Sequence, residues 1–513
     1  MTAPQNQSVL VLGLGASGLA MARWCVRQGA QVTVADTREA PPQLGALQSE
    51  LPGVRFVCAP LDAALLDTSA TMVLKSPGLA PALVAGVAAA AQAAGIPMSG
   101  ELGLFAQALE DLRVSAGYQP KVLAITGTNG KTTVTALTGQ LVERAGKTVA
   151  VAGNIGPTLL DTLARHIDAA TLPDVWVLEL SSFQLADSAA PHAGGNGHVV
   201  ARFEPAAACV LNLSQDHLDW HGDMAAYAQA KARVFGSRTL MLLNRDDTQV
   251  MAMLPAAAKG RPVRPYTSFG AGMPQRPGDF GLEQAHGMAW LVRVQELDPT
   301  YKLRKGQETE DLHIQRLIPA EALRIRGRHN AVNALAALAL AAAAGCALAP
   351  VLYGLREYRG EPHRVESIGV VQDVEYFDDS KGTNVGATVA GLGGLGAERK
   401  LVLILGGDGK GQDFSPLAAP VAQFARAVVL IGRDAALIRA ALEPGGIPLV
   451  DARDMVHAVA LAAQHARTGD AVLLSPACAS LDMFDNYVHR ARVFCEAVAA
   501  LAQEHGVLLE GTA

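Results

Sequence analysis

Residues 122–133 read VLAITGTNGKTT, an apolar run followed by a glycine-rich turn that ends in Gly-Lys-Thr. Such a turn between a strand and a helix presents backbone N–H groups and the positive end of the helix to phosphate oxygens. Lys131 adds a point charge, and the hydroxyl of Thr132 is a ligand for Mg²⁺. The full P-loop pattern places its first glycine where this chain has Ile125, and the chain offers Gly127 instead. The stretch therefore predicts a variant nucleoside triphosphate site.

The composition is that of a globular enzyme. The chain has 513 residues, of which 50% are apolar and 18% are charged, and its formal net charge is −6. This charge provides no general attraction for nucleic acid or anionic lipid, so we expect neither as a partner. Six cysteines without a C-x-x-C pair favour reduced thiols in a cytoplasm over a disulfide framework or a zinc site.

Two features argue against export or membrane insertion. The N-terminal MTAPQNQ lacks the basic and apolar regions of a signal peptide, and it leads directly into the strand-like SVLVLGLG. The longest charge-free run, from Ala331 to Leu355, is dominated by alanine, which is only weakly apolar. We expect this run to form buried or half-buried helix rather than a membrane span. We expect a cytoplasmic chain, and we take it to be monomeric.

Apolar β-branched runs alternate with Ala- and Leu-rich stretches along the chain, which predicts an α/β fold with mostly parallel sheets. At about 150 residues per domain, the length allows three domains. The turn-prone sequences GYQP and RGEPHR place them at 1–118, 119–358 and 359–513. The first and last should be Rossmann-like, and the second should be of the P-loop ATPase type. The irregular stretches 192–205 and 255–312 are expected to be exposed loops without chemistry.

A second glycine-rich turn follows the first strand of the chain. GLGASG, at 13–18, comes after SVLVL, and Asp36 ends the next apolar run, VTVAD. This is a dinucleotide fingerprint, in which glycines let the backbone approach a diphosphate and the acidic residue binds a ribose hydroxyl. Any nucleoside diphosphate offers the same groups, and the presence of a triphosphate loop in the same chain disfavours NAD. The alternative is a turn that only packs a helix on a strand.

Three further positions are candidates for metal chemistry. Glu179 ends an apolar strand in VWVLELSSFQL, where a carboxylate can meet Mg²⁺ at a triphosphate. His217 lies in DHLDWH after another strand, and Lys231 lies on a helix beyond that loop. Taken alone, a single histidine is more often a surface or packing residue than a metal ligand, and a helical lysine is usually solvated. The pattern by itself therefore leaves both roles open.

Taken together, these motifs closely resemble those of the Mur ligase family, in the same order and over nearly the whole chain. They are TGTNGKTT at 126–133, AGNIG at 152–156, LELSSFQ at 178–184, DHLD at 216–219, AK at 230–231, GRHN at 327–330, PHR at 362–364, DDSKGTN at 378–384, GGDGK at 406–410 and LSPACASLDMF at 474–484. Two positions depart from the pattern, because Gly382 stands where many relatives carry Ala and Tyr487 stands where Phe is familiar. The set is most similar to the family members that add D-glutamate.

The resemblance implies an ATP-dependent amide ligase that joins D-glutamate to UDP-N-acetylmuramoyl-L-alanine in cytoplasmic peptidoglycan precursor synthesis. The alanyl carboxylate would take the γ-phosphoryl group of ATP, and the amine of D-glutamate would attack the resulting acyl phosphate. The first domain would hold the uridine nucleotide, the second ATP with two Mg²⁺ ions, and the third D-glutamate. Family members also carry a carbamate on the lysine that matches Lys231. Catalysis should then require closure about the segment near Arg359.

The resemblance assigns residues to each ligand. The catalytic positions are Lys131, Glu179, His217 and Lys231. The metal positions are Thr132, Glu179, His217 and Lys231. The ATP positions are Gly127, Thr128, Asn129, Gly130, Lys131, Thr132, Thr133, Asn330, Arg364 and Asp379. The positions for the uridine substrate are Gly15, Ala16, Ser17, Asp36, Thr37, Arg38, Ser76, Asn154, Ser181 and Gln184. The positions for D-glutamate are Lys381, Thr383, Lys410, Ser480 and Tyr487.

Two alternative functions remain open from the sequence. One is a sister amide ligase that adds another amino acid, which the GLGASG turn and the LSPACASLDMF stretch disfavour. The other is a nucleotide-sensing protein without catalysis. A sensor needs the phosphate loop but no second metal ion, so the presence of Glu179, His217 and Lys231 favours an enzyme.

Overall fold

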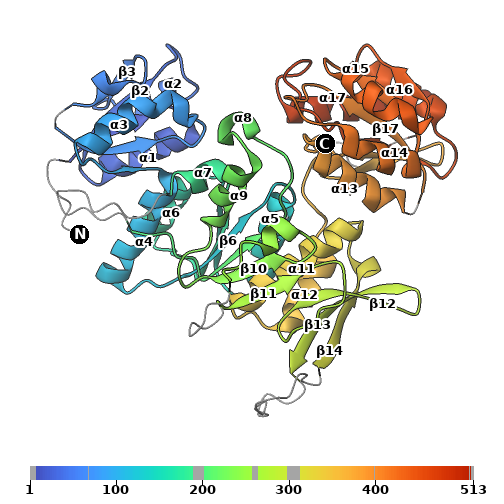
Figure 1. Ribbon diagram of the computed structural model, residues 1–513, viewed down its shortest axis with the longest axis horizontal. Coiled ribbons are helices and arrows are strands. Elements are labelled where there is room, and N and C mark those ends of the chain that lie inside the picture. Colours follow the sequence, from blue (N-terminus) through green and yellow to red (C-terminus); the bar gives the residue numbers. More distant parts are fainter. Residues whose placement is uncertain are drawn as a thin grey trace.

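The computed structural model describes residues 7–67, 69–188, 201–256, 264–296, 312–397, 399–507 and 509. Three large sheets follow one another along the chain, and a small antiparallel sheet lies next to the second. In Figure 1 the first sheet and its helices (blue) lie at the upper left and the last (orange to red) at the upper right, and the central part (cyan to yellow) joins them from below. The predicted α/β class with mostly parallel sheets is confirmed.

The N-terminal sheet has the strand order β3-β2-β1-β4-β5, and all its strands are parallel. The strands are β1 (Ser8–Leu12), β2 (Gln31–Asp36), β3 (Arg55–Cys58), β4 (Ala70–Lys75) and β5 (Met98–Ser99). The helices are α1 (Ala16–Arg27), α2 (Leu44–Glu50), α3 (Ala85–Ala93) and α4 (Glu101–Ala116). The carboxyl ends of parallel strands meet at one edge, so the turns after β1, β2 and β4 come together there.

The central sheet has the order β11-β10-β9-β6-β8-β7 and is also parallel. Its strands are β6 (Lys121–Thr126), β7 (Val149–Gly153), β8 (Val175–Glu179), β9 (Ala207–Val210), β10 (Leu240–Asn244) and β11 (Tyr266–Phe269). Its helices are α5 (Lys131–Arg144), α6 (Leu159–Asp168), α7 (Ser182–Ala186), α8 (Leu218–His221), α9 (Met224–Ala232), α10 (Thr248–Met251), α11 (Arg328–Ala343) and α12 (Leu348–Glu357). Strand β6 pairs with β8 and β9, so the loop that follows it starts from the interior of the sheet.

The alanine-rich run 331–355 forms most of two helices, α11 and α12, with a turn between them. Helix α11 is buried on nearly all sides because it packs against α5 and the central sheet, and small alanine side chains allow that close packing. Among the described residues, none of the helices has both the length and the apolar character that crossing a membrane requires. The prediction of buried or half-buried helix for this run is confirmed, with α11 buried and α12 half-buried.

The prediction of exposed loops for 255–312 is wrong in part. Strand β11 joins the central sheet, and β12 (Phe280–Ala285), β13 (Met288–Glu296) and β14 (Leu312–Pro319) form an antiparallel sheet. His286 and Gly287, both at positive φ, form the two-residue turn of the β12–β13 hairpin. The glycine of this turn is the local sequence signal for the hairpin. Residues 257–263 and 297–311 lie outside the described part of the chain. Of the other stretch, 201–205 contains neither helix nor strand, and 192–200 is not described.

The C-terminal sheet has the order β15-β16-β20-β17-β18-β19, in which only β15 is antiparallel to its neighbour. The strands are β15 (Glu366–Val371), β16 (Val374–Asp378), β17 (Leu401–Gly406), β18 (Ala425–Ile431), β19 (Leu449–Asp451) and β20 (Ala471–Leu474). The helices are α13 (Val385–Gly396), α14 (Ala418–Phe424), α15 (Ala435–Leu442), α16 (Met455–His465) and α17 (Tyr487–Glu504). Short 3₁₀ helices lie at Ala63–Leu65, Pro81–Val84, Ala320–Ala322, Ser415–Leu417 and Glu443–Gly445.

Candidate active site

A cavity of about 290 Å³ lies between the carboxyl edge of the central sheet and loops of the C-terminal part. Its lining comes from both sides: Thr128, Asn129, Gly130, Lys131, Thr132, Asn154, Ile155, Glu179, Gln215, Asp216, His217, Leu218, Asp219, Arg364, Lys381, Thr383, Asn384, Lys410, Gly411 and Gln412. The structure thus brings together predicted residues that are up to about 280 positions apart in sequence. A smaller cavity, of about 120 Å³, lies beside it and includes Asn330, Arg364 and Asp379.

The phosphate loop between β6 and α5 is held by glycines and by its own lysine. A Cβ atom added at Gly127 would lie 2.9 Å from the Cβ of Leu211, and one added at Gly130 would lie 2.7 Å from Oδ1 of Asn333, and both glycines have positive φ. The Nζ of Lys131 donates to the carbonyl oxygens of Gly127, at 2.9 Å, and of Thr128, at 2.7 Å. The Nζ atom of Lys131 therefore lies within the loop, where burial lowers the pKa of the lysine.

Glu179 lies at the end of β8, 1% exposed, and contacts the loop that follows β7. The side-chain amide of Asn154 donates to its Oε1 at 2.9 Å. Its other oxygen, Oε2, is buried and has no hydrogen-bond partner among the described residues. Burial of a carboxylate oxygen without a partner costs free energy unless a cation binds to it. Carboxylate oxygens are hard ligands of the kind that Mg²⁺ prefers. With Thr132 lining the same cavity, these residues fit a magnesium site.

His217 is the N-cap of α8, has a positive φ of 54° and lines the cavity. Its ring packs edge-on against Phe183 at 4.7 Å between centroids, and its Nε2 lies 3.5 Å from Oδ2 of Asp216. Burial lowers the pKa of the imidazole, and the nearby Lys131 and Lys231 lower it further. A neutral imidazole is the form that binds metal.

Lys231 does not line the cavity but lies directly behind the phosphate loop, 1% exposed. Its Nζ donates to the carbonyl oxygen of Gly127 at 2.8 Å and lies 4.6 Å from the centroid of the Tyr227 ring. Burial, with Lys131 as the next contribution, lowers its pKa well below the ordinary value for lysine. The hydroxyl of Tyr227 contacts Thr128 Oγ1 at 3.1 Å. Sequence reasoning missed Tyr227, although its position four residues before Lys231 places it on the same helix face.

The predicted D-glutamate residues are only partly at the cavity. Lys381, Thr383 and Lys410 line it, whereas Ser480 and Tyr487 are absent from its lining. Tyr487 is nevertheless adjacent, because the Nζ of Lys381 lies 3.9 Å from the centroid of its ring. Burial, followed by the nearby Arg364, lowers the pKa of Lys381 to about 8. Ser480 is 4% exposed and lies in the loop after β20.

The predicted ATP residues beyond the phosphate loop gather where α11 meets the C-terminal part. A guanidinium nitrogen of Arg364 donates to Oγ1 of Thr132, so the PHR motif touches the phosphate loop. Asp379 is buried and accepts a hydrogen bond of 2.6 Å from Ser475 Oγ. Burial raises the pKa of this carboxyl to about 7. Asn330, at the start of α11, donates to the carbonyl oxygen of Arg326 at 2.8 Å.

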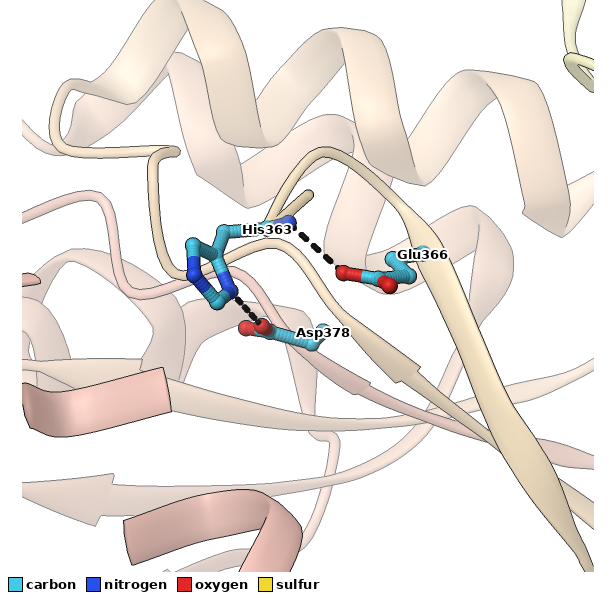
Figure 2. Close-up of side chains that lie close together, drawn as sticks. All are labelled: His363, Glu366 and Asp378. Atoms are coloured by element: carbon cyan, nitrogen blue, oxygen red, sulfur yellow. Dashed lines mark hydrogen bonds and ion pairs between the residues drawn. The ribbon is translucent and has the colours of Figure 1, made fainter. Parts of the chain in front are cut away.

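Next to Arg364, three side chains form a compact cluster: His363, Glu366 and Asp378 (Figure 2). The Nδ1 of His363 lies 2.7 Å from Oδ2 of the buried Asp378, and Glu366 accepts the backbone N–H of His363 at 2.8 Å. The contact with Asp378 raises the pKa of the imidazole. These potential metal ligands are already engaged with one another, so we interpret the cluster as an anchor for the loop that carries Arg364. The backbone N–H of Lys381 donates to the carbonyl oxygen of His363 at 3.2 Å, which joins both loops.

The predicted uridine residues lie mainly at the carboxyl edge of the N-terminal sheet. Asp36, 2% exposed, accepts hydrogen bonds from the backbone N–H of Leu14 at 2.8 Å and from Nη2 of Arg38 at 2.8 Å. The Arg38 hydrogen bond is the main reason that the pKa of Asp36 falls to about 2. The hydroxyl of Ser76 donates to the carbonyl oxygen of Gly13 at 2.9 Å. Gly15 and Thr37 lie in the same two turns, and Ala16 and Ser17 begin α1.

Three other predicted uridine residues belong to the central part. Asn154 lines the main cavity and bonds Glu179. Ser181 and Gln184 instead make a capping box at the start of α7, in which each side chain bonds the other's backbone N–H. Behind them, the Nζ of Lys75 pairs with Oδ2 of Asp187 at 2.8 Å, both side chains being mostly buried. This ion pair ties the turn that carries Ser76 to the central part.

Family models match most of the chain. The N-terminal domain of MurD-like Mur ligases matches residues 7–100, the Mur ligase middle domain 125–341, and the Mur ligase glutamate ligase domain 363–478. The chain is 66% identical to the UDP-N-acetylmuramoylalanine--D-glutamate ligase of Albidiferax ferrireducens, with 100% of both chains covered. It is 59% identical to the enzyme of that name from Polaromonas sp. (98% and 99% covered) and 57% identical to that of Burkholderia vietnamiensis (98% of both).

Solved structures of related ligases share the fold. The UDP-N-acetylmuramate-alanine ligase of Thermotoga maritima superposes with a TM-score of 0.52 at 19% identity, covering 96% of this chain and 99% of that one. MurF of Acinetobacter baumannii gives a TM-score of 0.56 at 17% identity, covering 96% and 92%. At these identities, the likeness concerns the arrangement of helices and strands alone.

Proposed function

The chain belongs to the Mur ligase family of ATP-dependent amide ligases, and we propose that it joins D-glutamate to UDP-N-acetylmuramoyl-L-alanine during synthesis of peptidoglycan precursors. Full-length relatives of 57% to 66% identity carry the name of that ligase. The observation that carries the proposal is the shared cavity, into which the central part contributes Lys131 and Glu179 and the C-terminal part contributes Lys381 and Lys410. An amide ligase needs this arrangement, because the activated carboxylate and the incoming amine must meet.

The proposed reaction has two steps. A carboxylate lacks a good leaving group, so an oxygen of the alanyl carboxylate first attacks the γ-phosphorus of ATP, and ADP departs. The amine of D-glutamate then attacks the carbonyl carbon of the acyl phosphate, loses a proton and expels phosphate. In the first step two anions, the alanyl carboxylate and the γ-phosphate, approach each other and repel. The positive charges of Lys131 and Arg364, which both contact the phosphate loop, reduce this repulsion.

Two magnesium positions accompany this proposal. The first would use Thr132 and Glu179, because the unpartnered Oε2 of Glu179 suits a cation. The second would use His217 and a carbamate on Lys231. Bound there, Mg²⁺ offsets negative charge on the phosphates and on the carboxylate that attacks them.

The surroundings of Lys231 support the carbamate. Burial and the neighbouring Lys131 lower the pKa of Lys231, and an amine adds to CO₂ only in its uncharged form. Addition forms an N–C bond and releases one proton, which gives an anionic group in place of a buried amine. An anion at this position would face Lys131 and provide oxygen ligands, whereas a lysine ammonium would repel a metal ion.

The C-terminal part offers cations for the carboxylates of D-glutamate. Lys381 and Lys410 line the cavity, and Thr383 adds a hydroxyl. Ser480 and Tyr487 would complete the site, with Tyr487 already in contact with Lys381. Charge-assisted hydrogen bonds of this kind fix both the position and the orientation of a dicarboxylic amino acid.

We assign uridine nucleotide binding to residues 1–118, ATP binding to 119–358 and D-glutamate binding to 359–513. The turns that carry Asp36 and Ser76 meet at one edge of the first sheet, as a nucleotide site requires. We further propose that the enzyme acts as a monomer in the cytoplasm. The six cysteines, all within the described part of the chain, are free, which agrees with a reducing compartment.

The proposal is tested by incubating the purified chain with ATP, Mg²⁺, UDP-N-acetylmuramoyl-L-alanine and D-glutamate. We expect stoichiometric release of ADP and phosphate, with a product whose mass equals the sum of both substrates less one water. Without D-glutamate, hydroxylamine should trap the acyl phosphate as a hydroxamate. Lys131→Ala should abolish trapping, whereas Lys121→Ala, an exposed lysine at the start of β6, should leave it unchanged. Phosphate release without a hydroxamate would contradict the acyl-phosphate step.

A further inference from the structure

Two asparagine side chains connect the phosphate loop directly to the C-terminal part. The Nδ2 of Asn129 donates to Oδ1 of Asn384 at 3.2 Å, and the Nδ2 of Asn384 donates to Oδ1 of Asn129 at 3.0 Å. The two residues are 255 positions apart, and Asn384 is 5% exposed. Two side-chain amides can exchange both hydrogen bonds in this way only when they lie edge to edge in about the same plane.

Each asparagine is fixed on its own side. The backbone N–H of Asn129 donates to Oδ1 of Asn212 at 2.8 Å, and Nδ2 of Asn212 donates to the carbonyl oxygen of Asn129 at 3.0 Å. Asn384 is the N-cap of α13, and its Oδ1 also accepts the backbone N–H of Ala387 at 2.9 Å. The pair therefore joins two positioned backbones rather than two mobile side chains.

Asn384 also lies where the loops for the amino acid meet. It follows Lys381 and Thr383 in the DDSKGTN motif. The next residue, Val385, donates its backbone N–H to Oε1 of Gln412 at 3.1 Å, and Gln412 donates to the carbonyl oxygen of Gly409 at 3.0 Å. The start of α13 thus holds both the Lys381 loop and the Lys410 loop.

Beside the pair, the backbone of α13 at Gly386 lies close to side chains of the central part. A Cβ atom added at Gly386 would lie 2.8 Å from Oγ of Ser214 and 3.2 Å from Nδ2 of Asn129. Gly386 has no positive φ, so its backbone does not require glycine. A side chain at position 386 would therefore require either that the side chains of Ser214 and Asn129 move or that α13 shifts away from the phosphate loop.

We propose that the Asn129–Asn384 pair is a positioning latch that sets the amino-acid loops in register with the phosphate loop, an inference that rests on the proposed function. When the pair forms, Lys381 and Lys410 face the same cavity as Lys131 and Glu179. When it is broken, the phosphate loop keeps its own contacts with the central part, such as that of Asn129 with Asn212, whereas the loops that carry Lys381 and Lys410 lose their fixed position relative to it. Loss of the latch therefore impairs use of D-glutamate more than binding of ATP, for which only Arg364 and Asp379 of the predicted residues come from the C-terminal part.

Asn384→Ser tests the latch while sparing the helix, because serine is a good N-cap and is too short to reach Asn129. Gly386→Ala tests it independently, because alanine favours the helix and only obstructs the close approach. Asp454→Ser, a cap exchange at the start of α16, is the matched control. For both latch variants we expect the D-glutamate KM to rise about tenfold, equivalent to about 1.4 kcal/mol. The Kd of a fluorescent ATP analogue should rise less, by about threefold at most.

Small-angle scattering supplies a readout that a change in local stability would not move. With a non-hydrolysable ATP analogue and the uridine substrate bound, the unmodified chain and Asp454→Ser should contract, and the latch variants should contract less. Unchanged D-glutamate KM values and equal contraction in both variants would overturn the latch. If the unmodified chain shows no phosphate release that depends on D-glutamate, the proposed function is wrong. The comparison of contraction by scattering would still test the latch on its own.

Discussion

The Nζ atom of Lys231 lies 2.8 Å from the carbonyl oxygen of Gly127, the first glycine of the phosphate loop. A lysine on α9 is thus placed behind the nucleotide loop, out of contact with bulk water. A buried ammonium so near Lys131 is unfavourable, which is why the pKa of Lys231 lies far below its ordinary range. Conversion of this amine to a carbamate would remove the repulsion and create a metal ligand.

Lys231→Ala should lose activity by about 100-fold or more, because a metal ligand is missing. Formate or acetate should restore part of the turnover by occupying the vacated space as a free carboxylate. Lys231→Arg is the matched control, since arginine fills the space but forms no carbamate, and we expect no rescue for it. Initial rates over a range of formate concentrations measure the effect. Near-normal turnover of Lys231→Ala without additives would show that the carbamate assignment is wrong.

Removal of divalent cations with a chelator should abolish turnover, and added Mg²⁺ should restore it. Glu179→Gln removes the buried carboxylate charge but keeps the size of the side chain, so the Mg²⁺ concentration for half-maximal activity should rise at least about tenfold. Glu143→Gln, an exposed position on α5, serves as the control. An unchanged Mg²⁺ activation curve for Glu179→Gln would place the metal elsewhere.

Lys410→Ala should weaken D-glutamate binding selectively. A charge-assisted contact is worth about 1.5–3 kcal/mol, so the D-glutamate KM should rise roughly tenfold to a hundredfold. The KM values for ATP and the uridine substrate should change far less. The comparison uses three-substrate kinetics with Lys400→Ala, an exposed lysine just before β17, as control. An equal rise for all three substrates would relocate the amino-acid site.

The N-terminal turn should bind a uridine diphosphate sugar and not NADH. Asp36→Asn should raise the Kd for the uridine substrate about tenfold or more, because it removes the charge that holds Leu14 and Arg38. With the pKa of Asp36 near 2, the carboxylate is ionised throughout neutral pH, so this penalty should not vary between about pH 6 and 9. Calorimetric titration measures both ligands, with the exposed Asp62→Asn as control. Saturable micromolar NADH binding in competition with the uridine substrate would refute the assignment.

Much of this site was predictable because its residues lie in short motifs at strand ends. Glu179 ends one strand and Lys131 follows a neighbouring strand of the same parallel sheet, so their meeting at its carboxyl edge follows from the topology alone. Lys381 and Lys410 follow strands of another sheet. That the two edges face each other is a property of the tertiary structure, which local pattern does not encode.

The contacts that sequence reasoning missed are all long-range or depend on weak local signals. The contact of His363 with Asp378 joins the loop before β15 to the end of β16. The contact of Asn129 with Asn384 joins loops that belong to two different sheets. The antiparallel sheet β12–β14 was hidden among Pro- and Gly-rich sequence, where only the His286-Gly287 turn signals a hairpin. Ser181 and Gln184, assigned to the uridine substrate by resemblance, are engaged in capping α7, so their part in binding stays a prediction.

The most direct test of the central claim is phosphate release by the purified chain with ATP and UDP-N-acetylmuramoyl-L-alanine, screened over D- and L-amino acids. We predict release that depends on D-glutamate, with L-glutamate and all other amino acids giving only the background rate. Equal or faster release with another amino acid would contradict the account and favour a sister ligase. Release that depends on no amino acid would contradict amide ligation altogether.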